Sequence, residues 1–136
     1  MRAYTYVKPG LASFVDVDKP VICKPTDAIV RIVKTTICGT DLHIIKGDVP
    51  ACKNGTILGH EGIGIVEEVG AGVSNFKKGD KVLISCVCAC GKCYCCKKGI
   101  YAHCEDEGGW IFGHLIDGMQ AEYLRVPHAY SLSHSS

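Results

Sequence analysis

Four cysteines within a fifteen-residue stretch constrain this chain more than any other feature of its sequence. They follow the spacing C-x2-C-x2-C-x7-C and are Cys90, Cys93, Cys96 and Cys104. Four thiolates this close together can surround one tetrahedral zinc ion at S–Zn distances of about 2.3 Å. We therefore predict a zinc-bound lobe, covering about residues 86–108, that stabilises the fold and does no chemistry.

The chain contains ten cysteines, so disulfides are the alternative to metal ligation. Its N-terminus lacks the continuous apolar run of a secretory signal, and no stretch approaches the ~18 apolar residues of a membrane span. We expect a cytoplasmic, reducing environment, in which cysteines bind metal more often than they form disulfides. The net charge of +1 gives no reason to expect nucleic acid or a membrane surface as a partner.

Short segments rich in β-branched residues, separated by Gly and Pro, predict a mainly β domain of the barrel or sandwich type. A short helix should end before Gly47, with Thr40 or Asp41 as its N-terminal cap. The C-terminal SLSHSS is polar and is expected to fray. The predicted strands cover residues 2–7, 11–17, 27–37, 59–70, 81–86 and 121–126.

A second possible metal site involves Cys38 and His60, which lie far apart in the sequence beside glycines. A catalytic zinc site uses three protein ligands and leaves one position open for water or substrate. Cys38 and His60 could supply two of the three, and the metal would then polarise an alcohol or carbonyl oxygen. The alternative is that Cys38 is a small buried residue and His60 a structural histidine.

Four polar residues next to this pair favour the catalytic interpretation. The Thr40 hydroxyl could accept a proton from the substrate, and His43 could pass it to water. Asp41 could accept a hydrogen bond from a ligating imidazole and fix its tautomer. Glu61 could move towards the metal or tune its charge. Each also has an ordinary explanation, since Thr40 and Asp41 could cap the helix and His43 and Glu61 could be solvated.

Together these motifs give the chain a family resemblance. The pattern G-H-E-x2-G-x5-G-x2-V spans residues 59–73, and C-G-x-C-x-x-C-x-x-G-x4-C spans residues 90–104. Cys38-Gly39-Thr40-Asp41-x-His43 and Gly79-Asp80-Lys81-Val82 add two further matches. The sequence resembles the N-terminal catalytic domain of zinc-dependent medium-chain alcohol dehydrogenases.

The resemblance implies a GroES-like, partly open β-barrel with short helices over residues 1–136. It implies catalytic zinc at Cys38 and His60 with Glu61 beside them, and structural zinc at the four clustered cysteines. Thr40 and His43 would form a proton relay, Asp41 would hold His60, and Trp110 would lie near the substrate pocket. The parent enzyme would oxidise a small alcohol to an aldehyde or ketone with NAD or NADP, and could be a homo-oligomer.

Two family features are missing from the 136 residues. No G-x-G-x-x-G follows a strand, so we expect the nucleotide-binding domain to be absent. The family's third ligand of the catalytic zinc also lies further along the chain. We therefore expect the structural zinc to be bound tightly. We expect the catalytic position to be empty, weakly held or completed by water, and the chain to show no catalytic turnover.

Three extra cysteines near the cluster could compete for metal or be buried without a role: Cys86, Cys88 and Cys95.

Two other functions fit parts of the sequence. A zinc-stabilised β-barrel that only binds or scaffolds would suit the β-rich pattern, but it has no use for Cys38, His60 and their neighbours. An iron–sulfur carrier also begins C-x2-C-x2-C, but its last gap is shorter and its fourth cysteine is followed by Pro. Here the gap is seven residues and Glu105 follows Cys104.

Overall fold

The computed structural model describes residues 1–129 and 132–135, and it confirms a mainly β fold with short helices. No helix among these residues is both long enough and apolar enough to cross a bilayer. The elements in chain order are β1 (Arg2–Lys8), β2 (Leu11–Asp16), β3 (Ala28–Thr35), α1 (Gly39–Lys46), β4 (Gly62–Val69), β5 (Lys81–Ile84), α2 (Tyr94–Lys97), the 3-10 turn η1 (Tyr101–His103), β6 (Tyr123–Val126) and β7 (Leu132–His134).

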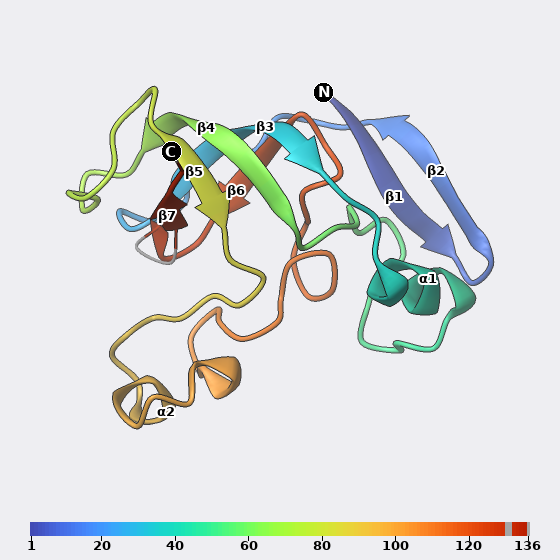
Figure 1. The fold of residues 1–136 in the computed structure, drawn as a ribbon. Helices are drawn as coiled ribbons and strands as arrows, with labels where there is room; N and C mark the ends of the chain where they lie inside the picture. The colour runs from blue at the N-terminus through green and yellow to red at the C-terminus, as the bar shows by residue number, and fades with distance from the viewer. Residues whose placement is uncertain (130–131, 136) are drawn as a thin grey trace.

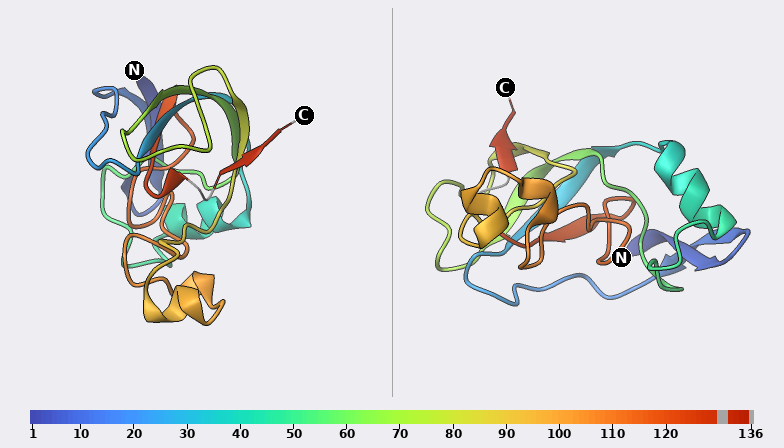
Figure 2. Two further views of the ribbon diagram at one scale, coloured as in Figure 1. Left: turned by 90° about the vertical axis from the view of Figure 1, so that its left-hand side faces the viewer. Right: turned by 90° about the horizontal axis from the view of Figure 1, so that it is seen from below.

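The strands form a larger antiparallel sheet and a separate hairpin. The larger sheet has the order β6-β3-β4-β5-β7, whereas β1 and β2 pair with each other (Figure 1). Seen from the side, the larger sheet is strongly curved (Figure 2). Its concave face encloses a core that includes Val30, Val66, Val82, Phe112 and Leu124, each no more than 2% exposed. This arrangement confirms the expected GroES-like barrel.

The predicted strands all form, but most are shorter than their sequence patterns. The strand expected over residues 59–70 begins only at Gly62, so His60 lies in the loop before β4. The hairpin turn forms at Gly10, whose positive φ of 85° suits glycine. The β-branched residues of β3 extend the strand, and Ala28, Ile29 and Val30 are fully buried.

Helix α1 begins two or three residues before the predicted start, because its N-terminal cap is not Thr40 or Asp41. Its N-terminal cap is Cys38, and Thr40 and Asp41 lie within the first turn. The carboxylate of Asp41 accepts the backbone N–H of Cys38 at 2.9 Å, so Asp41 stabilises the cap from inside the helix. Gly47 ends the helix in the left-handed conformation, as expected.

The prediction of a frayed C-terminus is wrong for residues 132–134. Leu132, Ser133 and His134 form β7, which pairs with β5 opposite Ile84, Leu83 and Val82 respectively. The Leu132 side chain is buried in the core. Pairing with a strand some fifty residues earlier overrides the polar local sequence, and residues 130, 131 and 136 lie outside the described residues.

The four clustered cysteines lie in a lobe that leaves the sheet after β5 and returns before β6. This lobe contains α2 and η1 and projects away from the sheet (Figures 1 and 2). At its base, Cys88 and Gly109 exchange two backbone hydrogen bonds of 3.0 and 2.7 Å. The lobe and α1 lie at opposite ends of the molecule (Figure 2, right).

Candidate metal centres

The four cysteines predicted to bind metal converge in space. One sulfur atom from each of Cys90, Cys93, Cys96 and Cys104 lies within 4.8 Å of the others. The sulfurs of Cys90 and Cys96 are 4.0 Å apart. A tetrahedral ZnS4 site with bonds of about 2.3 Å requires S···S separations of about 3.8 Å, so the pocket fits zinc with small adjustments.

Backbone N–H groups point to several of these sulfurs. The N–H groups of Cys93 and Cys90 point to the sulfurs of Cys90 and Cys104, each at 3.2 Å. N–H groups of Glu105 and Cys96 lower the pKa of Cys93 to about 6, whereas burial raises the pKa of Cys96 to about 12. Metal binding must therefore displace a proton from Cys96, which is ordinary for thiolate ligands.

The extra cysteines do not join the cluster. Cys88 is fully buried at the base of the lobe, and burial raises the pKa of its thiol to about 12. Cys86 is exposed, and Cys95 directs its thiol to Glu105, with the sulfur 3.8 Å from Oε1. Within the described residues, the donor set around the predicted ion is therefore the four predicted cysteines.

The second candidate centre joins α1 to the loop before β4. The Cys38 sulfur lies 3.9 and 4.0 Å from the two ring nitrogens of His60. A carboxylate oxygen of Asp41 completes a group whose ligand atoms all lie within 4.8 Å of one another. Sulfur, imidazole nitrogen and carboxylate oxygen are all donors that zinc accepts. The structure thus brings together two residues that are 22 positions apart.

The surroundings of Asp41 differ in part from the prediction. Its Oδ2 accepts hydrogen bonds from the Cys38 N–H at 2.9 Å and from Gln120 Nε2 at 3.1 Å. Its Oδ1 is buried and has no hydrogen-bond partner in the described part of the chain. A buried carboxylate oxygen without a partner is costly, and an imidazole N–H or a cation at this centre would satisfy it.

Gln120 is a site residue that the sequence did not reveal. It is 8% exposed, and its Nε2 contacts both Asp41 and the carbonyl oxygen of Thr36, the latter at 3.2 Å. It also fills the space beside Gly59, where an added Cβ would lie 2.8 Å from Gln120 Cγ. In the sequence, Gln120 is only an amide side chain just before the strand expected over residues 121–126. Nothing in that position indicates that it contacts Asp41.

Trp110, which the resemblance places near the substrate pocket, lies beside His60. The two ring centroids are 6.1 Å apart at an angle of 60°, and the indole stacks on His114 at 4.1 Å. The indole Nε1 is buried without a hydrogen-bond partner among the described residues. The ring therefore presents apolar surface and one unused donor next to the centre, and a role in substrate binding stays a prediction.

The other three predicted residues lie within five positions of Cys38 or His60 in the sequence. Thr40 is half-buried in the first turn of α1. His43 is exposed on the same helix, and its Nδ1 lies 3.2 Å from Asp48 Oδ2. Glu61 is exposed, and its carbonyl oxygen accepts the Thr35 hydroxyl at 2.9 Å. The proton relay and the role of Glu61 therefore stay predictions.

Comparison with known proteins agrees with both centres. Residues 24–135 match the family described as the alcohol dehydrogenase GroES-like domain. The chain is 44% identical to an uncharacterized zinc-type alcohol dehydrogenase-like protein of Bacillus subtilis, over 95% of this chain and 37% of that protein. It is 40% identical to an alcohol dehydrogenase of Cupriavidus necator, over 95% of this chain and 39% of that protein.

Solved structures show the same relation. A zinc-dependent alcohol dehydrogenase 2 from Streptococcus pneumoniae superposes with a TM-score of 0.95 at 87% identity, over all of this chain and 39% of that one. An alcohol dehydrogenase from Thermus sp. ATN1 gives a TM-score of 0.90 at 37% identity, over all of this chain and 40% of that one. The chain thus spans less than half the length of these relatives, and it belongs to the family of alcohol dehydrogenase GroES-like domains.

Proposed function

We propose that residues 1–136 form the metal- and substrate-binding domain of an NAD(P)-dependent zinc alcohol dehydrogenase. The parent reaction would oxidise a small alcohol to an aldehyde or ketone. The convergence of Cys38, Asp41 and His60 carries this proposal, because it brings His60, from the loop before β4, to two donor side chains at the start of α1, next to an aromatic ring. A scaffold domain has no need of such a group.

Cys38 and His60 would hold the catalytic zinc, which supplies Lewis acidity when bound. Asp41, fixed by Gln120 and by the N–H of Cys38, would orient the imidazole of His60. The aromatic face of Trp110 would orient the apolar part of the substrate and exclude water from one side.

Proton transfer would use α1. The Thr40 hydroxyl, two residues after Cys38, would accept the proton that the alcohol loses. His43 lies one turn further and is 65% exposed, so it can exchange that proton with water. Glu61 is placed next to His60 in the sequence, where its charge would tune the centre.

The four-cysteine centre would hold structural zinc and stabilise the lobe. Residues 1–136 contain no dinucleotide-binding fingerprint. This segment alone therefore offers no binding site for the nicotinamide that accepts the hydride. We therefore expect the isolated 136 residues to bind metal without NAD-dependent alcohol oxidation.

Metal content tests this proposal. The purified chain should retain one zinc through dialysis and bind a second, exchangeable metal, detected with Co2+ by its thiolate charge-transfer absorption. The second metal should disappear in Cys38→Ser and His60→Ala and persist in Cys23→Ser, which removes an exposed cysteine far from His60 in the sequence. A single metal in all four proteins would favour the zinc-stabilised scaffold, and two full protein-only sites would contradict the expected weak catalytic position.

A further inference from the structure

Backbone strain in this molecule is concentrated where the lobe meets the barrel. Among the described residues, the non-glycine residues with positive φ are Glu107, at 44°, and His128, at 55°. L-residues avoid this region, and they remain there only where the surroundings hold them. Glu107 follows the last lobe cysteine by three positions, and His128 follows β6 by two.

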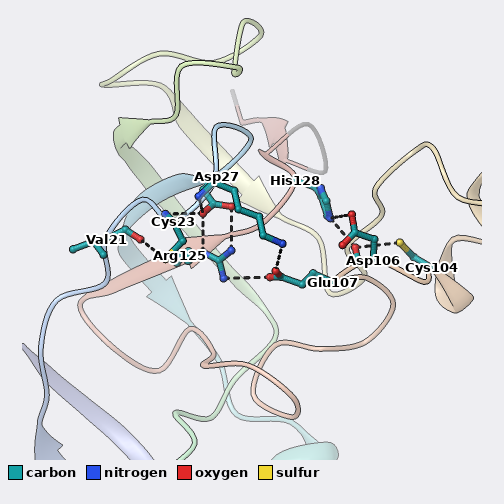
Figure 3. A network of polar contacts seen from close by, with 9 residues as sticks. Val21, Cys23, Asp27, Cys104, Asp106, Glu107, Arg125 and His128 are labelled. Atoms are coloured by element: carbon teal, nitrogen blue, oxygen red, sulfur yellow. Dashed lines mark hydrogen bonds and ion pairs between the residues drawn. The ribbon is translucent and has the colours of Figure 1, made fainter.

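On the barrel side, Arg125 of β6 makes a two-pronged ion pair with a buried carboxylate. Its Nε and Nη2 lie 2.8 and 3.2 Å from the two oxygens of Asp27, a residue with no exposed surface. The Oδ2 of Asp27 also accepts the backbone N–H groups of Cys23 and Lys24 at 2.9 and 2.8 Å. This geometry fixes the guanidinium, so its remaining nitrogen points in a set direction (Figure 3).

That nitrogen points to the lobe. Arg125 Nη1 lies 3.2 Å from Glu107 Oε2, and the ammonium of Lys24 binds the other oxygen of the same carboxylate. Beside this contact, His128 Nε2 lies 2.7 Å from the carbonyl oxygen of Asp106 and donates to it (Figure 3). Two adjacent lobe residues are thus held by three side chains of the barrel and the loop before β3.

The held segment is the one that carries the fourth metal ligand. The Cys104 thiol lies 3.6 Å from the carbonyl oxygen of Asp106, the same oxygen that His128 contacts. A Cβ added to Gly108 would lie 2.3 Å from the Cys104 sulfur, so the chain folds back directly onto that ligand. Displacing Asp106 and Glu107 would therefore displace Cys104 relative to the other three sulfurs.

We propose that Arg125 and Glu107 are positioning residues for the four-cysteine metal centre. Arg125, locked by Asp27, holds Glu107 in its strained conformation, and this fixes the position of Cys104. Contacts from the barrel thereby determine the rate at which the lobe releases its metal. This inference rests on the proposed structural zinc at the four cysteines.

The test compares zinc release from the 136-residue chain and its Glu107→Gln variant. The substitution removes the charge at the lobe end and leaves the Asp27–Arg125 pair intact, so the barrel should still fold. The matched control is Glu68→Gln, which removes an exposed carboxylate from β4. Substituting a residue that orients a metal ligand commonly lowers the metal affinity by about tenfold or more. We expect Glu107→Gln to release zinc to a chromogenic chelator roughly tenfold faster than the control.

A spectroscopic readout separates positioning from general destabilisation. With Co2+ at the four cysteines, Glu107→Gln should shift the ligand-field bands, because they report the geometry of the sulfurs. Arg125→Lys, which keeps the charge but loses the two-pronged fork, should shift them in the same way. Release rates and spectra equal to those of Glu68→Gln would overturn the inference. A wild-type chain without bound zinc would instead contradict the proposed structural centre, and the positioning role with it.

Discussion

At the scale of single residues, the second candidate metal centre depends on one backbone position. Gly59 has a φ of 102°, which L-residues rarely adopt, and it immediately precedes His60. A Cβ at this position would lie 2.8 Å from Gln120 Cγ and 3.1 Å from the backbone nitrogen of Gln120. Any side chain here would therefore push apart the two segments that carry the candidate ligand His60 and the partner of Asp41.

Gly59→Ala should therefore destabilise the chain and weaken the second centre. The left-handed backbone costs an L-residue about 1–2 kcal/mol, and overpacking adds about 1–3 kcal/mol. The matched control is Gly79→Ala, because Gly79 has a φ of 95° with nothing within 4 Å of its added Cβ. Urea unfolding should show the larger loss for Gly59→Ala, and Co2+ titration should show loss of the exchangeable metal only there. Equal losses would show that the contact with Gln120 is unimportant.

The difference between Asp41 and Gln120 shows what the sequence could predict about single residues. Asp41 is predictable because it lies three positions after Cys38, at the start of the same helix, so local spacing is enough. Gln120 is 79 positions from Asp41. It reaches Asp41 because its backbone carbonyl accepts the N–H of Tyr4 and its backbone N–H donates to the carbonyl of Leu58. Such pairing has no signature in the spacing of residues, so the support of Asp41 could not be predicted.

At the scale of elements, every predicted strand forms, and the strand that the sequence does not predict, β7, is the shortest among the described residues. The β-branched residues of the segment 27–37 predict a strand, and β3 forms there, with its first half buried on both faces and its second half mostly exposed. Strand β7 has three residues, and only Leu132 is apolar. Strand β7 forms because it pairs with the free edge of β5. The polar residues of β7 give no sign of this pairing.

Leu132 gives a direct test of β7. Leu132→Ala should lower the free energy of unfolding by about 2–3 kcal/mol, because a buried leucine is replaced and a cavity is left. Ser133→Ala, on the exposed face of the same strand, should change it by less than about 0.5 kcal/mol. Guanidinium unfolding measures both. A C-terminus that frays in solution would instead leave the two variants indistinguishable.

At the scale of the whole molecule, the two candidate metal centres lie in different parts of one fold. The four cysteines could be assigned from the sequence because all four ligands lie within one short segment. The network that ties the lobe to the barrel joins Asp27, Glu107 and Arg125 from three distant segments. Buried ion pairs of this kind carry no periodicity or motif, so their position became visible only in the structure.

This network should make the stability of the whole chain depend on pH in the acid range. Burial disfavours the charged form of Asp27, but hydrogen bonds from Arg125 and from the N–H groups of Lys24 and Cys23 outweigh it and lower the pKa below the ordinary 3.8. A carboxyl whose pKa is lower in the folded state stabilises that state above pH 3.8. The stabilisation is lost as the pH falls through the folded-state pKa.

Asp27→Asn should therefore cost stability at neutral pH, by about 2 kcal/mol, and cost less as the medium becomes acidic. The difference in the free energy of unfolding between wild type and variant, measured between pH 6 and pH 3, should begin to narrow once the pH falls below about 4. Protonation of the cysteine ligands destabilises both proteins alike, so the difference between them isolates Asp27. Asp16→Asn, which changes an exposed carboxyl at the end of β2, should follow the wild-type profile. A wild-type advantage that stays constant over this range would show that Asp27 contributes by packing and hydrogen bonding and not through its charge.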